Sequence, residues 1–173
     1  SIFSETRGIS VLFSDPVEDL DIHDNYIEVG TGDLTAQSQI GILTLGQNAT
    51  IEGLNKGFIR NNVIEVQKAN YGIFSAGWNF LAVSDNEVNI NNTSGPSADD
   101  AFGIYYINGI DGLVACNEVS AESLNGDPNT GILIQSSFNN PITCNDVSFT
   151  DEGIVFQGSC IGTDFKGNSF NRH

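Results

Sequence analysis

Apolar and polar residues alternate along this chain in short runs that are separated by turn residues. Four of these runs are Ile9-x-Val11, Ile27-x-Val29, Ile64-x-Val66 and Val88-x-Ile90. A period of two residues is typical of β-strands, whereas an amphipathic helix needs a 3.6-residue period over ten or more positions. The pattern therefore predicts an all-β protein built from many short strands.

The alternating runs belong to a phrase that occurs six times. Each copy begins with a Gly-Ile pair and continues with the segment apolar-x-x-Asn-x-apolar. The pairs begin at Gly8, Gly41, Gly72, Gly103, Gly131 and Gly153, and the asparagines are Asn25, Asn62, Asn86, Asn117, Asn145 and Asn168. A phrase that recurs every 22 to 33 residues is typical of a solenoid, in which each repeat forms one rung. We expect a parallel β-helix of about six rungs, each with about three strands, that spans residues 1–173 as one domain.

Stacked rungs should place equivalent residues in columns, because neighbouring strands lie ~4.8 Å apart. The isoleucine after each glycine is expected to form one buried column: Ile9, Ile42, Ile73, Ile104, Ile132 and Ile154. The asparagines fall where the chain turns between two strands. Asn tolerates the left-handed backbone conformation, and stacked side-chain amides can hydrogen-bond from rung to rung. We therefore predict that the six asparagines form an internal structural ladder.

This repeated phrase resembles the repeat of right-handed, pectate-lyase-like parallel β-helix proteins, from about Gly8 to Phe170. One segment also resembles large secreted β-helix proteins of the Bacteroidetes type; it runs from Ile142-Thr143-Cys144-Asn145 through Gly162-Thr163-Asp164-Phe165-Lys166-Gly167-Asn168. The resemblance implies a single-stranded, right-handed β-helix that is extracellular or at the surface of a bacterial cell. It implies no single activity, because such folds serve as lyases, hydrolases, epimerases, phage spikes and non-catalytic adhesins.

The net charge of the chain limits the kinds of partner that it can bind. The net charge of −16, from 22 acidic and 6 basic residues, disfavours binding to nucleic acid or to an anionic membrane surface. No apolar run approaches the ~20 residues that a membrane-spanning helix needs. Because the open ends of a β-helix expose unpaired strand edges, we expect the chain to be a section of a longer solenoid or to assemble end to end.

Catalytic motifs of β-helix enzymes are largely missing. Asp99-Asp100 before a predicted strand resembles the paired acids of polygalacturonase-like members, but the chain has no Gly-His-Gly and no Arg-x-Lys. Paired carboxylates can act as acid and base when their environments separate their pKa values, although a loop Asp pair is more often a solvated turn. Asp99 and Asp100 are therefore weak catalytic candidates for a polysaccharide lyase or a glycoside hydrolase.

An acidic column follows the predicted ladder. Glu87, Glu118 and Asp146 each come directly after a ladder asparagine, and Glu28 and Glu65 should also face outward on neighbouring rungs. Like charges ~5 Å apart repel by roughly 0.8 kcal/mol in water, and a bound Ca²⁺ would relieve this repulsion. The alternative is an acidic face that keeps the protein soluble. We expect no required cofactor. If the protein binds a metal ion, the pattern predicts calcium at Glu87, Glu118 and Asp146.

Aromatic residues provide the strongest binding hypothesis. Alternation sends the second residue after each glycine outward, which gives the column Leu43, Phe74, Tyr105, Leu133 and Val155. An apolar, partly aromatic strip can stack against sugar rings or contact a partner protein. The alternative is that a loop covers it, because parallel sheets are usually buried on both faces. We predict that a polysaccharide or cell-surface glycan binds at Phe74, Trp78, Tyr105, Phe102 and Tyr71.

The three cysteines include one pair in phase. Cys116 and Cys144 both directly precede a ladder asparagine, so they should lie on consecutive rungs. The rung spacing falls within the Cα separation of a disulfide, so these two cysteines could form a disulfide in an oxidising compartment. Cys160 is out of phase and is expected to be a free, buried thiol. The spacing of the three residues fits no zinc motif.

Together these features favour an extracellular, non-catalytic recognition or scaffold module that is glycan-binding or adhesive. Two alternatives stay open. The first is a polysaccharide lyase or glycoside hydrolase of the β-helix type. The second is a purely structural segment of a long adhesin or filament.

Overall fold

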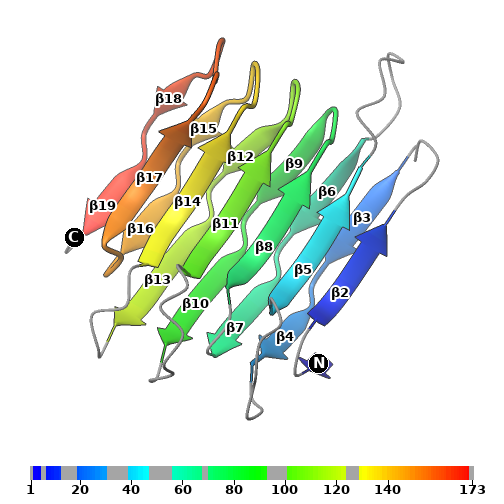
Figure 1. The fold of residues 1–173 in the computed structure, drawn as a ribbon, viewed down its shortest axis with the longest axis vertical. Helices are drawn as coiled ribbons and strands as arrows, with labels where there is room; N and C mark the ends of the chain where they lie inside the picture. Colours follow the sequence, from blue (N-terminus) through cyan, green and yellow to red (C-terminus); the bar gives the residue numbers. More distant parts are fainter. Residues whose placement is uncertain are drawn as a thin grey trace.

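The computed structural model describes residues 2–4, 7–12, 19–30, 39–46, 56–67, 70–92, 101–123 and 129–171. Every regular element among these residues is a β-strand, and the strands form three parallel sheets that we name A, B and C (Figure 1). Sheet A contains β1 (Ile2–Ser4), β4 (Tyr26–Val29), β7 (Val63–Gln67), β10 (Glu87–Asn92), β13 (Glu118–Ser123), β16 (Asp146–Ser148) and β19 (Ser169–Asn171).

The other two sheets have six strands each. Sheet B contains β2 (Arg7–Leu12), β5 (Ile40–Leu45), β8 (Tyr71–Ala76), β11 (Ala101–Ile107), β14 (Asn129–Gln135) and β17 (Glu152–Gln157). Sheet C contains β3 (Leu20–His23), β6 (Gly57–Arg60), β9 (Leu81–Ser84), β12 (Leu113–Ala115), β15 (Ile142–Thr143) and β18 (Phe165–Lys166). From β2 onward the chain visits sheets B, C and A in turn, and each strand pairs with the strand three places later. This order is that of a parallel β-helix of about six rungs, which confirms the predicted fold.

The column of isoleucines lies where the repeat places it. These six residues pair in register across sheet B, and the middle four are fully buried. The glycine before each of the first five isoleucines is needed because the backbones of successive rungs approach closely. A Cβ atom added to Gly103 would lie 2.6 Å from the carbonyl oxygen of Gly131 and 2.3 Å from Val119 Cγ1. Space, rather than backbone conformation, therefore explains the repeated glycine.

The asparagine ladder runs through all six rungs. Each side-chain amide donates to the Oδ1 atom of the next asparagine at 2.9–3.0 Å. Each backbone N–H donates to that same oxygen at 2.9–3.1 Å. The ladder is thus confirmed, but its backbone conformation differs from the prediction. The left-handed residue is the one before each asparagine, as at Cys116 with φ 53° and Cys144 with φ 62°.

Candidate functional site

Four aromatic side chains form a continuous cluster on the outer face of sheet B. Tyr71 and Phe74 come from β8, and Phe102 and Tyr105 come from the neighbouring strand β11. Tyr71 stacks on Phe102 with ring centroids 5.5 Å apart and planes 12° apart, whereas Phe74 meets Tyr105 edge-on. All four side chains are half-buried, so part of each ring is open to solvent. We name this cluster the aromatic platform.

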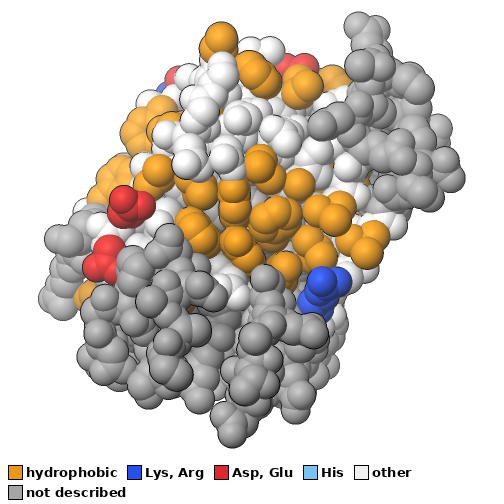
Figure 2. Space-filling view, viewed as in Figure 1, with side chains coloured by type: hydrophobic (Ala, Val, Ile, Leu, Met, Phe, Trp, Pro, Cys, Tyr) orange, Lys and Arg blue, Asp and Glu red, His pale blue; other side chains and the backbone are white. Residues whose placement is uncertain are grey.

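Apolar side chains flank the platform, and a polar side chain lies beside it on the next rung. Figure 2 shows hydrophobic side chains gathered in the middle of the sheet B face. Leu43 and Leu133 flank the platform in the same outward column and are only 5% and 7% exposed. Toward the C-terminal rungs the Tyr105 hydroxyl donates to Gln135 Oε1. The outward register is as predicted, and the rings are neither fully covered nor fully open.

The Tyr105 hydroxyl stays protonated at neutral pH. Burial raises the pKa of Tyr105 above its ordinary value of 10.0, so the side chain is neutral at neutral pH. A neutral phenol can both donate and accept a hydrogen bond. The platform therefore combines stacking area with one polar group that is held in a known direction by Gln135.

Trp78 does not belong to this surface, and its predicted place in the binding face is wrong. The indole is fully buried in the core. Gly77 at the end of β8 has a left-handed φ of 72°, so the chain turns there and carries the next side chain inward. Trp78 packs beside Gly46 of the preceding rung, where an added Cβ atom would lie 3.1 Å from Trp78 Cδ2. Its role is structural.

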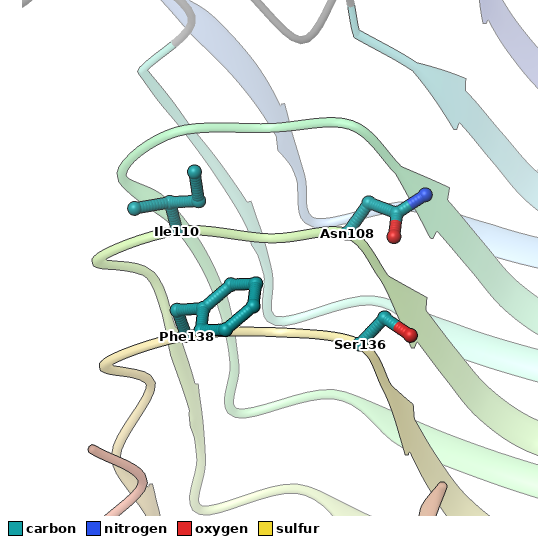
Figure 3. A pocket seen from close by; sticks show the side chains of 4 residues that line it. All are labelled: Asn108, Ile110, Ser136 and Phe138. Atoms are coloured by element: carbon teal, nitrogen blue, oxygen red, sulfur yellow. The ribbon is translucent and has the colours of Figure 1, made fainter. Parts of the chain in front are cut away.

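A pocket of about 230 Å³ lies at the turn between sheets B and C, directly beyond the ends of β11 and β14 (Figure 3). Asn108 and Ile110 line it from one rung, and Ser136 and Phe138 line it from the next. Ile110 and Phe138 bridge the two rungs in parallel register. Both apolar side chains are exposed, and an amide and a hydroxyl stand beside them. We name this feature the corner pocket.

Buried polar groups fix the walls of the corner pocket. The Gly109 N–H donates to Ser137 Oγ at 3.1 Å, and the Gly112 N–H donates to Asn140 Oδ1 at 2.7 Å. The amide of Asn140 in turn donates to the carbonyl oxygens of Gly109 and Phe138 at 3.1 and 2.8 Å. Asn140 thus links two rungs through its side-chain amide, as the ladder asparagines do. Sequence reasoning missed this site, because the residues that line it share no repeated letter.

The acidic column of sheet A is arranged in the predicted register. Glu87 pairs with Glu118, and Glu118 pairs with Asp146, with all three side chains exposed. Amides relieve part of the repulsion, since Asn89 Nδ2 donates to Glu65 Oε1 at 3.0 Å and to Glu87 Oε1 at 2.9 Å. Within the described part of the chain, no group of three or more His, Cys, Asp or Glu side chains is placed to hold a metal ion. The calcium hypothesis therefore gains no support from these residues.

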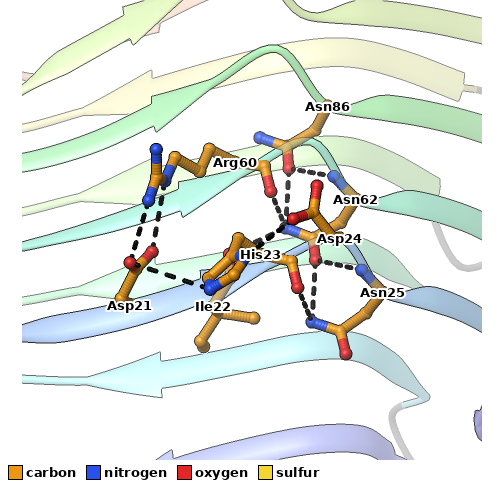
Figure 4. Close-up of polar contacts among 8 residues, drawn as sticks. All are labelled: Asp21, Ile22, His23, Asp24, Asn25, Arg60, Asn62 and Asn86. Atoms are coloured by element: carbon orange, nitrogen blue, oxygen red, sulfur yellow. Dashed lines mark hydrogen bonds and ion pairs between the residues drawn. The ribbon is translucent and has the colours of Figure 1, made fainter.

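A second polar cluster lies on sheet C near the N-terminal end of the ladder (Figure 4). Arg60 donates to both carboxylate oxygens of Asp21, at 3.2 and 2.9 Å, and this hydrogen bond holds the pKa of Asp21 below its usual range. His23 Nδ1 lies 2.8 Å from Asp24 Oδ2. All these groups are exposed to solvent, where ion pairs contribute little. The cluster is a surface ion pair rather than a catalytic arrangement.

The weak catalytic candidates cannot be placed. Asp99 and Asp100 lie outside the described residues. Cys116 and Cys144 lie on consecutive rungs, and both are free thiols in this structure. Cys160 is also free and packs, partly buried, against the core.

Comparisons with protein-family models, with curated proteins and with solved structures found no match for this chain. Among the residues that the structure describes, no helix is long and apolar enough to cross a membrane. The fold and the surface together define a parallel β-helix that presents an aromatic platform beside a corner pocket.

Proposed function

We propose that the protein is an extracellular, non-catalytic recognition module that binds a polysaccharide or cell-surface glycan across the aromatic platform and the corner pocket. The observation that carries this proposal is the continuous contact among Tyr71, Phe74, Phe102 and Tyr105 on an outward face. Aromatic faces suit the apolar faces of sugar rings, and polar groups nearby can fix the orientation of the ring.

The arrangement suits an oligosaccharide rather than a single sugar. The platform lies on β8 and β11 and the pocket lies beyond the ends of β11 and β14, so β11 connects the two. From Phe102 to Ile107 this strand rises by ~17 Å at ~3.3 Å per residue. Stacking would occur on the platform, while the Asn108 amide and the Ser136 hydroxyl would bond sugar hydroxyls in the pocket. The net charge of −16 favours a neutral or cationic glycan over an acidic one.

The experiment is a glycan array with neutral, cationic and acidic polysaccharides, with and without calcium, followed by titration of any hit against variants. Tyr105→Ala and Phe138→Ala should weaken binding, whereas Phe58→Ala should not, because Phe58 is 51% exposed on a different sheet. Assays of reducing ends and of unsaturated products run on the same hits. Product formation would replace the proposal with the lyase or hydrolase alternative, and unchanged affinity in both platform and pocket variants would remove it.

A scaffold function is favoured by a separate observation at the C-terminal end. The inward columns of sheets C and A finish at Phe165 and Phe170, which are 47% and 44% exposed although the preceding members are fully buried. In the described residues, β17, β18 and β19 each form the last strand of their sheet. Flanking solenoid rungs, or a second copy stacked end to end, would cover these columns.

Light scattering after gel filtration tests the scaffold function independently of glycan binding. Wild-type protein should self-associate in a concentration-dependent manner, and Phe165→Ser with Phe170→Ser should shift it to monomer. Leu45→Ser offers a matched control, because Leu45 is an exposed apolar residue away from this end. A wild-type protein that stays monomeric at high concentration would exclude association of this chain with itself.

A further inference from the structure

Cys116 and Cys144 occupy the same place in consecutive turns. Cys116 follows β12 and Cys144 follows β15, and the residues before them, Ala115 and Thr143, are paired in register. The Cys116 N–H donates to the Thr143 carbonyl oxygen at 3.0 Å. Both cysteines have left-handed backbones and both side chains are exposed. Two thiols therefore leave the solenoid side by side and in the same direction.

The Cys144 thiol affects the protonation of Cys116. A hydrogen bond between them, with further effects of burial and of the Asp85 carboxylate, raises the pKa of Cys116 to about 11. Asp85 occupies the equivalent turn of the preceding rung, since its N–H donates to the Ala115 carbonyl oxygen at 3.1 Å. On the far side lies Lys166, whose ammonium group is paired with Asp164 at 2.6 Å. Cys116 is therefore protonated at neutral pH, and both side chains are open to solvent.

The rung spacing permits two kinds of chemistry at this dithiol. In-register residues lie ~4.8 Å apart, which is within the Cα separation of a disulfide, so oxidation could join the two sulfur atoms. Two metal–thiolate bonds of ~2.3 Å can span sulfur atoms up to ~4.6 Å apart. Thiolates select soft ions such as Cu(I). Within the described residues no third His, Cys, Asp or Glu joins the pair, which disfavours the four-coordinate site that Zn²⁺ prefers.

We propose that Cys116 and Cys144 form a two-coordinate binding site for a soft, thiophilic cation of the Cu(I) type. Binding of one ion forms two metal–sulfur bonds and releases the two thiol protons, with no change of oxidation state. Because two protons leave, the apparent affinity rises about 100-fold per pH unit while both thiols are protonated. This site is independent of the aromatic platform and of glycan binding.

The test is an anaerobic titration of the reduced protein with Cu(I) in competition with a chromophoric Cu(I) chelator. Wild type should retain one equivalent of Cu(I) per chain, and Cys160→Ser should retain the same equivalent. Cys116→Ser and Cys144→Ser should each bind about 10²- to 10⁴-fold more weakly, because the second thiolate no longer binds at high effective concentration. Circular dichroism of each variant checks that the β-helix is intact.

Three results would overturn the site. The first is a wild type that cannot compete with the chelator, and the second is a single-cysteine variant that keeps full affinity. The third is a purified protein whose mass is two hydrogens lower because a disulfide joins Cys116 and Cys144, and whose disulfide is not reduced by a small-molecule thiol. In that case the pair is a covalent link between two rungs instead of a metal site.

Discussion

The ring of Tyr105 stands edge-on against the ring of Phe74, with centroids 5.1 Å apart and planes at 74°. Because the two residues come from paired strands, each ring holds the other in place. Tyr105→Ala should weaken glycan binding about 2- to 13-fold, which corresponds to about 0.5–1.5 kcal/mol for one aromatic contact. Isothermal titration with the best array hit measures the change.

Tyr105→Phe is the matched control, because it keeps the ring and removes only the hydroxyl that donates to Gln135. Its affinity should lie near that of wild type if stacking dominates. A loss in Tyr105→Phe as large as in Tyr105→Ala would instead assign the binding energy to the hydroxyl.

Trp78→Ala should destabilise the protein without acting on the binding surface. The indole is fully buried, and truncation of a buried Trp costs about 3–5 kcal/mol. Urea unfolding measures the loss, and the variant that remains folded should bind glycan as wild type does. Full stability combined with lost binding would return Trp78 to the site.

The sequence predicts the strands of this structure better than its turns. The two-residue alternation and the Gly-Ile phrase predict the rungs, the buried isoleucine column and the outward register of Phe74 and Tyr105. Neither pattern predicts the conformation of the turns. Gly77 changes the direction of the chain through its left-handed backbone, so counting alternate residues from β8 misplaces Trp78.

The corner pocket was missed for the same reason. Asn108 and Ser136 are both left-handed residues that follow equivalent strands, with φ of 53° and 47°. Their shared property is a backbone conformation, which different residue types adopt, so no repeated letter marks the position. The register of Cys116 and Cys144 could be predicted, because both residues directly precede ladder asparagines. Their bonding state could not, because it depends on redox conditions.

Gly103→Ala should destabilise the β-helix. The added methyl group would lie 2.6 Å from the Gly131 carbonyl oxygen, and this backbone atom cannot move without opening the sheet. Overpacking of this kind costs about 1–3 kcal/mol. Ser10→Ala on the exposed face of β2 is the control and should change the free energy of unfolding by less than about 0.5 kcal/mol. Equal stability of the two variants would contradict the steric explanation of the repeated glycine.

Asn117→Ala should cost more stability than Asn168→Ala. Asn117 is buried in mid-ladder, where its oxygen accepts two hydrogen bonds from Asn86 and its amide donates to Val83 and Asn145. Removal leaves buried partners unsatisfied, which costs about 1–3 kcal/mol. Asn168 stands half-buried in the last rung, where water can replace part of the lost bonding. Thermal and urea unfolding compare the two, and glycan affinity should be unchanged in both.

Tyr106 should make the fold sensitive to alkaline pH. Its ring is fully buried, and its hydroxyl has no hydrogen-bond partner in the described structure. Burial raises the pKa of Tyr106 well above its ordinary value of 10.0. Above pH 10 the unfolded chain releases this proton while the folded chain keeps it. The unfolded state then binds fewer protons, so stability falls as pH rises, by about 1.4 kcal/mol per pH unit from this one group.

Tyr106→Phe tests this directly, because it keeps the ring and removes the hydroxyl. At pH 8 the variant should be at least as stable as wild type, since a buried unsatisfied group costs about 1–3 kcal/mol. Between pH 10 and 11 the difference in free energy of unfolding should widen in favour of Tyr106→Phe by about 1 kcal/mol. The pKa values of Tyr26 and Tyr105 are also raised, but both residues are present in both proteins and cancel in the difference. Parallel pH profiles of the two proteins would mean that Tyr106 ionises in the folded state, which requires water or a polar partner to reach the interior column.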